Sequence, residues 1–150
     1  MPLSAVRGFS PSALAAAMTR KPAQINDVAD AIGISRQSVT AWLKGKSSPT
    51  PDVLARTAQW LNIPIADLVP IPADRLRISD LRVRAGLSQK AAAAGLGMPA
   101  STVADIERGR RPVSTDVVAR FAELYDQDVA VVAASWDRAN AARRAYLDSL

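Results

Sequence analysis

The side chains that could do chemistry in this chain are charged groups, amides and hydroxyls, because cysteine and histidine are both absent. Without cysteine there is no disulfide, thiol nucleophile or thiolate metal site, and without histidine the usual general base and the commonest metal ligand are missing. The adjacent residues Arg36 and Gln37 offer something else, since a guanidinium and an amide can each form two hydrogen bonds to one planar partner. These residue types predict binding rather than catalysis, with no enzyme activity and no metal or other cofactor.

The charge and hydrophobicity of the chain fit a soluble protein with an anionic partner. Lys and Arg number 19 against 14 Asp and Glu, which gives a formal net charge of +5 over 150 residues. Hydrophobic residues make up 49% of the chain, enough to bury a core, yet no apolar run approaches the roughly 18 residues that a membrane span requires. The segment Met1–Arg20 does not resemble a secretory signal. We therefore expect a cytoplasmic, nucleoid-associated protein.

Short helices must position these side chains. Ser10 followed by Pro11 is typical of the first residues of a helix, and Gly33 and Gly45 are typical of helix ends. The apolar spacing between such signals predicts two sets of five helices. The expected ranges are 11–20, Asp27–Ile32, Arg36–Lys44, Asp52–Leu61 and Ile65–Val69 in the first set, and Arg75–Ala85, Gln89–Leu96, Ala100–Arg108, Thr115–Tyr125 and a helix from Val129 onward in the second.

The helix expected at Arg36–Lys44 has two different sides. Ser35 precedes it as a cap, and helical spacing places Val39, Trp42 and Leu43 together on one side. The opposite side is polar. It carries Arg36, Gln37, Thr40 and Lys44.

The two sets of helices share an internal repeat. Gly33 lies 64 residues before Gly97, and Gly45 lies 64 residues before Gly109. At this interval, without a gap, identical residues face one another at several further positions. Among these pairs are Val39 with Val103, Asp52 with Asp116, Arg56 with Arg120 and Ala58 with Ala122. A duplicated unit of about 60 residues is the economical interpretation.

A stiff segment, Pro70-Ile71-Pro72, separates the two units. We expect one domain at residues 1–72 and a second at residues 73–150, with a linker too short for the units to swing freely. After Ala133 the repeat ends and a helix is expected to continue to Leu150. Trp136, Tyr146 and Leu147 are expected to pack back on the second unit, and a subunit contact is the alternative.

A helix, a short glycine-containing turn and a second helix form the helix-turn-helix arrangement, whose second helix can enter the major groove of DNA. Here the chain resembles the Cro/CI-type, or XRE-like, helix-turn-helix repressors of phages and bacteria, over residues 10–69 and again over residues 74–133. The second copy is the closer match. It carries Leu81-Arg82, Gly86-Leu87-Ser88-Gln89, Ala93, Leu96-Gly97, Ser101-Thr102-Val103 and Ile106-Glu107-Arg108-Gly109-Arg110-Arg111-Pro112, whereas the first copy has Ala23-Gln24-Ile25 in place of the Leu-Ser-Gln entry but keeps Val28-Ala29, Gly33, Ser38-Val39 and Gly45.

The resemblance implies an ion pair inside the second copy. Arg82 and Glu107 match the residues that tie the first helix of the unit to the recognition helix, and both are replaced by apolar residues, Met18 and Leu43, in the first copy. Removing one member of a buried pair costs about 3–5 kcal/mol, whereas replacing both by hydrophobic residues is often neutral. The alternative is that Arg82 and Glu107 are solvated surface groups.

The resemblance also implies which residues contact DNA. In the first copy Arg36, Gln37, Thr40 with Ala41, Lys46 and Ser47 match the positions that contact bases, and Ser35, Ser38 and Lys44 lie among them, the last two suited to phosphates. In the second copy the matching set is smaller and less basic on the helix itself. It consists of Gln89, Ala100, Ser101, Thr102, Asp105, Arg108, Arg110 and Arg111.

These observations predict an all-α protein with two tandem, five-helix, lambda-repressor-like helix-turn-helix domains and a C-terminal helix. The expected function is a sequence-specific repressor of transcription, similar to phage immunity repressors, whose partner is double-stranded operator DNA. Because the two copies carry unlike residues at matched positions, we expect a monomer on an asymmetric site. In the alternative, only the first domain contacts DNA and the second is a dimerisation or protein-interaction module.

Overall fold

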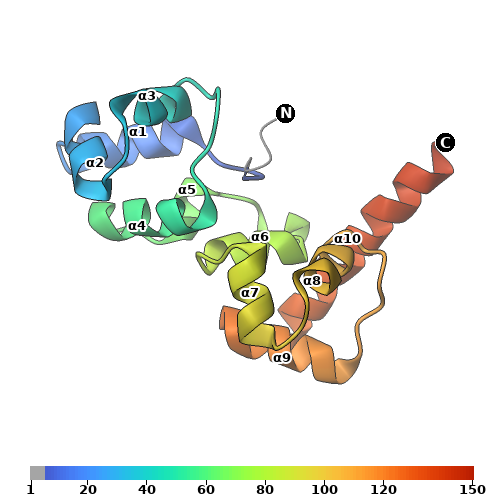
Figure 1. The fold of residues 1–150 in the computed structure, drawn as a ribbon. Coiled ribbons are helices and arrows are strands. Elements are labelled where there is room, and N and C mark those ends of the chain that lie inside the picture. Colours follow the sequence, from blue (N-terminus) through green and yellow to red (C-terminus); the bar gives the residue numbers. More distant parts are fainter. Residues whose placement is uncertain (1–5) are drawn as a thin grey trace. The chain divides into compact units, whose positions relative to one another are not determined.

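Helices account for the regular structure of residues 6–150, the part of the chain that the structure, a computed structural model, describes (Figure 1). This part contains ten α-helices, one short 3-10 helix and no strand, which confirms the expected all-α class. No helix within it is both long enough and apolar enough to cross a bilayer. The chain divides into two compact units, of which the first ends at Ile71 and the second is Pro72–Leu150.

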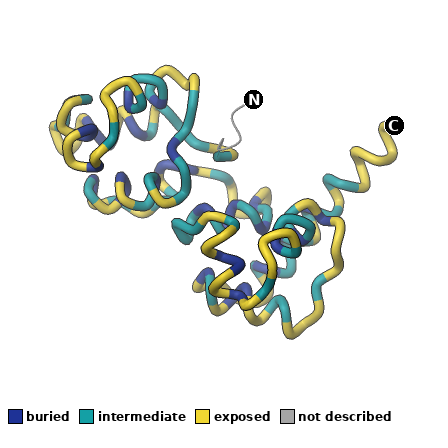
Figure 2. The backbone as a smooth tube through the Cα atoms, in the orientation of Figure 1, coloured by how far each residue is buried: buried dark blue, intermediate teal, exposed yellow. Residues whose placement is uncertain are grey.

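The first unit is built from five helices around a small core. They are α1 (Pro11–Arg20), α2 (Ile25–Ile32), α3 (Arg36–Leu43), α4 (Pro51–Leu61) and α5 (Ile65–Leu68). Helix α1 begins as expected, because the Ser10 Oγ accepts the Ala13 N–H at 3.1 Å. The side chains of Leu14, Val28, Val39 and Leu54 are fully buried, one from each of the first four helices. Figure 2 shows buried positions of this unit, in dark blue, beside exposed ones in yellow.

The second unit repeats the helix pattern and then departs from it. Its elements are η1 (Ala73–Arg75), α6 (Ile78–Arg84), α7 (Gln89–Leu96), α8 (Ala100–Glu107), α9 (Thr115–Tyr125) and α10 (Val129–Asp148). Helices α7, α8 and α9 have the bounds of α2, α3 and α4 shifted by the interval that separates the paired glycines. Helices α4 and α9 even end alike, on Asn62 and Asp126 in the left-handed conformation.

Two expected helix starts were wrong, and in both units the cause is an aspartate. Helix α2 begins at Ile25, two residues before the expected start, because the Asp27 carboxylate accepts the Gln24 N–H at 2.7 Å. An aspartate that closes a capping interaction occupies the third helical position, not the first. The other expected first and last residues lie within one residue of those observed, apart from the start of α6 and the end of α10, which was expected at Leu150 and lies at Asp148.

Helix α6 begins at Ile78 and not at Arg75, for the same reason. Asp80 is buried and accepts the Arg77 N–H at 2.8 Å, so Arg77 becomes the residue that precedes the helix. Arg75 instead closes the 3-10 turn, with its N–H bonded to the Pro72 carbonyl at 2.9 Å.

Helix α10 is one continuous helix, in which the expected fifth helix of the second unit and the C-terminal helix are joined. Its first part is anchored in the core by Val132, Ser135 and Ala139, which are buried. The expectation that Tyr146 and Leu147 pack back was wrong, since they are 55% and 48% exposed. The last turns of α10 extend past the helices that it packs against (Figure 1).

Candidate nucleic-acid interface

The turn between α2 and α3 is tight and sets the direction of α3. Gly33 adopts φ 77°, and its N–H and that of Ile34 both bond to the Ala29 carbonyl, at 2.9 and 3.0 Å. Ser35 then caps α3 by accepting the Ser38 N–H at 3.1 Å. The second unit uses the same geometry at Gly97, with φ 67°, but Pro99 precedes α8. Each unit therefore contains one pair of helices joined by a three-residue turn, α2 with α3 in the first unit and α7 with α8 in the second.

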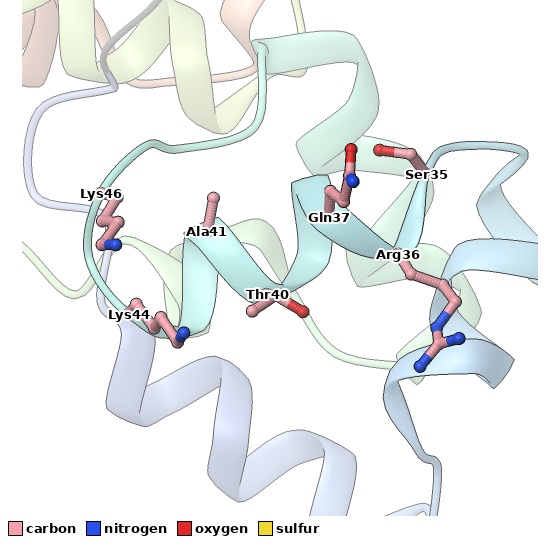
Figure 3. Close-up of a pocket in the computed structure, with 7 residues that line it drawn as sticks. All are labelled: Ser35, Arg36, Gln37, Thr40, Ala41, Lys44 and Lys46. Carbon is pink, nitrogen blue, oxygen red and sulfur yellow. The ribbon is translucent and has the colours of Figure 1, made fainter.

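The outer face of α3 presents polar side chains from a rigid helix. Val39 and Trp42 are buried and hold the helix against the core, while Arg36 and Gln37 are exposed. Figure 3 shows the side chains of Arg36, Thr40 and Lys44 in one row along the helix. Helical spacing requires this row, since the three residues are four apart.

Most of the residues expected to contact DNA in the first unit surround one hollow. The hollow has a volume of about 580 Å³ and combines α3 with the turn after it (Figure 3). Its lining is Ser35, Arg36, Gln37, Thr40, Ala41, Lys44 and Lys46. Ser38 is half-buried, with its Oγ 2.9 Å from that of Ser35, and Ser47 borders a neighbouring hollow on the side of Phe9. The structure thus brings seven of the nine expected residues together.

The matching surface of the second unit is less polar on the helix and more basic after it. Ala100 and Ser101 are exposed at the start of α8, and Thr102 and Asp105 are half-buried. Cationic side chains follow in the turn that ends the helix. Arg108, Arg110 and Arg111 are all exposed there.

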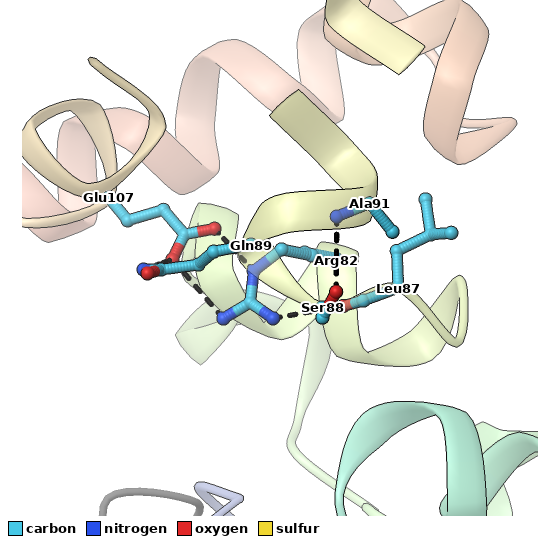
Figure 4. A network of polar contacts seen from close by, with 6 residues as sticks. All are labelled: Arg82, Leu87, Ser88, Gln89, Ala91 and Glu107. Atoms are coloured by element: carbon cyan, nitrogen blue, oxygen red, sulfur yellow. Dashed lines mark hydrogen bonds and ion pairs between the residues drawn. The ribbon is translucent and has the colours of Figure 1, made fainter. Parts of the chain in front are cut away.

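A buried polar network supports α8 from behind. The Arg82 guanidinium binds the Glu107 carboxylate through two hydrogen bonds, Nε to Oε2 at 2.6 Å and Nη2 to Oε1 at 3.2 Å (Figure 4). The two side chains are only 11% and 5% exposed, which confirms the expected pair and excludes the solvated alternative. Arg82 also donates from Nη1 to the Leu87 carbonyl at 2.9 Å. The pair therefore ties α6, the turn before α7 and α8 together.

Comparisons with known proteins agree with this geometry. A family model described as helix-turn-helix matches residues 20–68, and a second, described as helix-turn-helix domain, matches residues 73–135. This chain is an XRE-like helix-turn-helix protein with two such domains in tandem. Searches of curated proteins and of solved structures give no significant match. As an XRE-like protein it is a DNA-binding regulator of transcription, and its partner is double-stranded DNA.

One residue that the resemblance assigns to DNA contact, Gln89, takes part in this buried polar network. Gln89 is half-buried, and its Nε2 donates to the Glu107 Oε1 at 2.9 Å (Figure 4). One amide hydrogen of Gln89 is thereby held inside the unit. The phosphate contact expected of Gln89 stays a prediction, and it would have to use the other amide hydrogen.

An arginine in each domain also supports the helix-turn-helix, and neither arginine was among the expected site residues. The Arg56 Nη1 donates to the Ile32 carbonyl at 2.8 Å, and the Arg120 Nη2 donates to the Leu96 carbonyl. Each guanidinium thus bonds a carbonyl at the end of the first helix of the pair, where helical carbonyls lack partners. The signal was present in the sequence, because Arg56 and Arg120 are identical at the repeat interval.

Tyr125, at the end of α9, is a buried polar residue of this XRE-like protein that the sequence analysis did not single out. Its ring packs edge-on against Phe121, with centroids 5.5 Å apart, and its hydroxyl is buried with no hydrogen-bond partner. Burial raises the pKa of the Tyr125 phenol above its usual range, and the nearby Glu107 charge adds to this. The phenol is therefore neutral in the folded domain.

We expect Tyr125→Phe to leave the stability of the second domain unchanged or to raise it by up to about 1 kcal/mol. The variant keeps the ring contact with Phe121 and removes a hydroxyl that is desolvated without a hydrogen bond in return. Denaturant unfolding measures the effect, and Tyr146→Phe, at an exposed ring, is the matched control. A loss of about 1 kcal/mol in the first variant alone would mean that the Tyr125 hydroxyl has a partner.

Proposed function

We propose that this protein is a transcriptional repressor, of the kind that maintains phage or prophage immunity, and that it occupies an asymmetric operator. Residues 1–72 and 73–150 act as two DNA-binding domains, with α3 and α8 as their recognition helices. The single observation that carries the proposal is the hollow on α3. Arg36 and Gln37, which are able to contact base edges, line this hollow together with two lysines. Binding across a promoter then blocks transcription without any cofactor or catalytic step.

Helix α3 supplies most of the sequence specificity. Arg36 and Gln37 are exposed at its first turn, where side chains of a helix lying in the major groove reach base edges. Arginine bonds the O6 and N7 of guanine, and glutamine bonds the N6 and N7 of adenine. Lys44 and Lys46 are exposed at the other end of the hollow. Although the position of Lys46 is one that the resemblance assigns to bases, we assign both lysines to phosphates, and these contacts position the helix.

Helix α8 supplies more affinity than specificity. Ala100 and Ser101 stand where Arg36 and Gln37 stand in the first domain, and neither can form the paired hydrogen bonds that identify a purine. The exposed arginines after the helix attract the phosphate backbone instead. A site bound by two such different helices is asymmetric, and one chain supplies both of them.

Substitutions in the hollow test the assignment of roles. Arg36→Ala or Gln37→Ala should weaken binding to the operator by about 1–3 kcal/mol and relax the preference at one or two base pairs. Lys46→Ala is the matched control within the same hollow and should weaken binding to all sequences alike. Selection of bound sequences from a random pool measures both effects. Equal losses on operator and random DNA for Arg36→Ala and Gln37→Ala would contradict base contact by α3.

A second candidate keeps DNA binding in the first domain and makes the second domain a dimerisation or protein-interaction module. The observation that favours it is the free end of α10, where Tyr146, Leu147 and Leu150 are exposed, the last at 85%. This candidate predicts two chains on a palindromic site. We favour the single chain because the basic turn after α8 suits DNA better than it suits an apolar partner.

A further inference from the structure

The turn that ends α8 is pressed against the backbone of α10. Gly109 in this turn is buried and adopts φ 70°. A Cβ at this position would lie 2.6 Å from the Asn140 Cα and 2.7 Å from the Ala139 carbonyl oxygen. Both neighbours are backbone atoms of a helix, which cannot move aside as a flexible side chain can. Glycine is therefore required both by its conformation and by the close approach of α10.

Asn140 fixes the same turn by a hydrogen bond. Its Nδ2 donates to the Gly109 carbonyl at 2.8 Å. The next N–H along the chain, that of Arg110, donates to the Asp105 carbonyl at 3.0 Å, in the manner of a helix C-terminus. The peptide between Gly109 and Arg110 is thus bonded on both of its sides, once to α8 and once to α10. This bonding sets the direction in which the Arg110 side chain leaves the backbone.

Helix α10 is a rigid support for this contact. It packs against α6, α8 and α9. Ala139, the neighbour of Asn140, is 4% exposed, and the Arg138 Nη1 donates to the Leu76 carbonyl, just before α6, at 2.7 Å. Arg138 and Asn140, on either side of Ala139, therefore tie the beginning of the domain and the end of its recognition helix to α10.

The first domain lacks this support. Gly45 has nearly the same conformation, with φ 71°, but it is exposed, and a Cβ there would be no closer than 3.8 Å to Pro11 Cγ. Helix α5 ends at Leu68 after four residues. Within residues 6–71, the part of the first unit that the structure describes, no contact to the turn at Gly45 matches that of Asn140 with Gly109.

We propose that Asn140 is a positioning residue for DNA binding, through which α10 holds the turn at residues 108–111 so that its three arginines meet the phosphate backbone together. The inference rests on the proposed DNA contact of Arg108, Arg110 and Arg111. An unsupported turn would present the same charges over a range of directions, and part of the binding free energy would be lost in ordering them.

The test measures binding of the full chain to a mixed-sequence duplex of about three helical turns, because phosphate contacts do not depend on sequence. We expect Asn140→Ala to weaken binding about 3- to 10-fold and to make the slope of log K against log salt shallower by about one. Ser135→Ala is the matched control, since it removes a buried hydroxyl of the same helix that bonds to the Val132 carbonyl within α10 and not to the turn. It should leave both the affinity and the salt slope unchanged.

Two further variants keep the outcome decisive. Asn140→Asp preserves the size of the side chain but removes its donor, and should weaken binding at least as much as Asn140→Ala. In a chain with all three arginines of the turn changed to alanine, Asn140→Ala should have no further effect, whereas a general loss of folding would appear in thermal unfolding. Wild-type binding by Asn140→Ala, beside a clear loss in the triple variant, would overturn the positioning role alone. Wild-type binding by the triple variant would overturn the DNA contact itself and the positioning role with it.

Discussion

Glu107→Ala should destabilise the second domain by about 3–5 kcal/mol, because it leaves the Arg82 guanidinium buried without its counter-charge. The carboxylate accepts two hydrogen bonds from Arg82 and one from Gln89, and all of them would be lost at once. A loss of this size is a large part of the stability of a small domain. Hydrogen exchange of the amides in α6, α7 and α8 measures it without interference from the first domain.

The first domain supplies the matched compensating variant. There Met18 is buried in α1 and Leu43 half-buried in α3, at the positions of Arg82 and Glu107. The double change Arg82→Met with Glu107→Leu should therefore regain most of the loss, since replacing both charges by hydrophobic residues is often neutral or stabilising. If the double variant were as unstable as Glu107→Ala, or if Glu107→Ala lost less than about 1 kcal/mol as exposed pairs do, the network would not have the role that its burial indicates.

Cutting the chain between the two domains should lower its affinity for the operator about 100-fold or more. While the linker is intact, binding of one domain holds the other at high local concentration near the DNA, and this gain disappears when the domains separate. The short segment from Pro70 to Pro72 makes the effect large, because a short linker leaves little volume for the second domain to explore.

A protease site introduced at Ile71 allows the comparison, with the same uncleaved variant as the control for the insertion itself. Light scattering of the intact protein on its minimal operator should give the mass of one chain per site. A complex of two chains on a palindromic site would refute the single-chain proposal and support the second candidate. An unchanged affinity after cleavage would show that only one domain contributes to binding.

Most of the fold could be predicted from the sequence, because the starts and ends of the helices depend on local signals. Ser10, Ser35 and Ser88 precede helices and accept N–H groups of the first turn as a cap should, and Gly33 and Gly97 end helices in the left-handed conformation that glycine permits. Each of these contacts joins residues at most four apart, so the pattern of residue types is enough to predict it. The hollow on α3 follows from helical spacing for the same reason.

What the sequence could not provide depends on contacts between distant residues. The hydrogen bond from Asn140 to Gly109 joins residues 31 apart, and that from Arg138 to Leu76 joins residues 62 apart. Neither has a local signature in the residues around it. The exposure of Tyr146 and Leu147 was equally hidden, because helical spacing shows which side of a helix is apolar but not where the neighbouring helices end.

The unlike residues behind the two recognition helices constrain how the gene can recombine. A crossover between the halves that joined α6 to the first domain's α3 would place Arg82 beside Leu43, with no carboxylate to receive its charge. The reciprocal product would bury Glu107 near Met18 and be no better. Both recombinants would fail in folding before their DNA binding mattered. The two halves can therefore be exchanged between related genes only at breakpoints that keep α6 with α8 and α1 with α3, and a breakpoint near residues 70–72 is one of them.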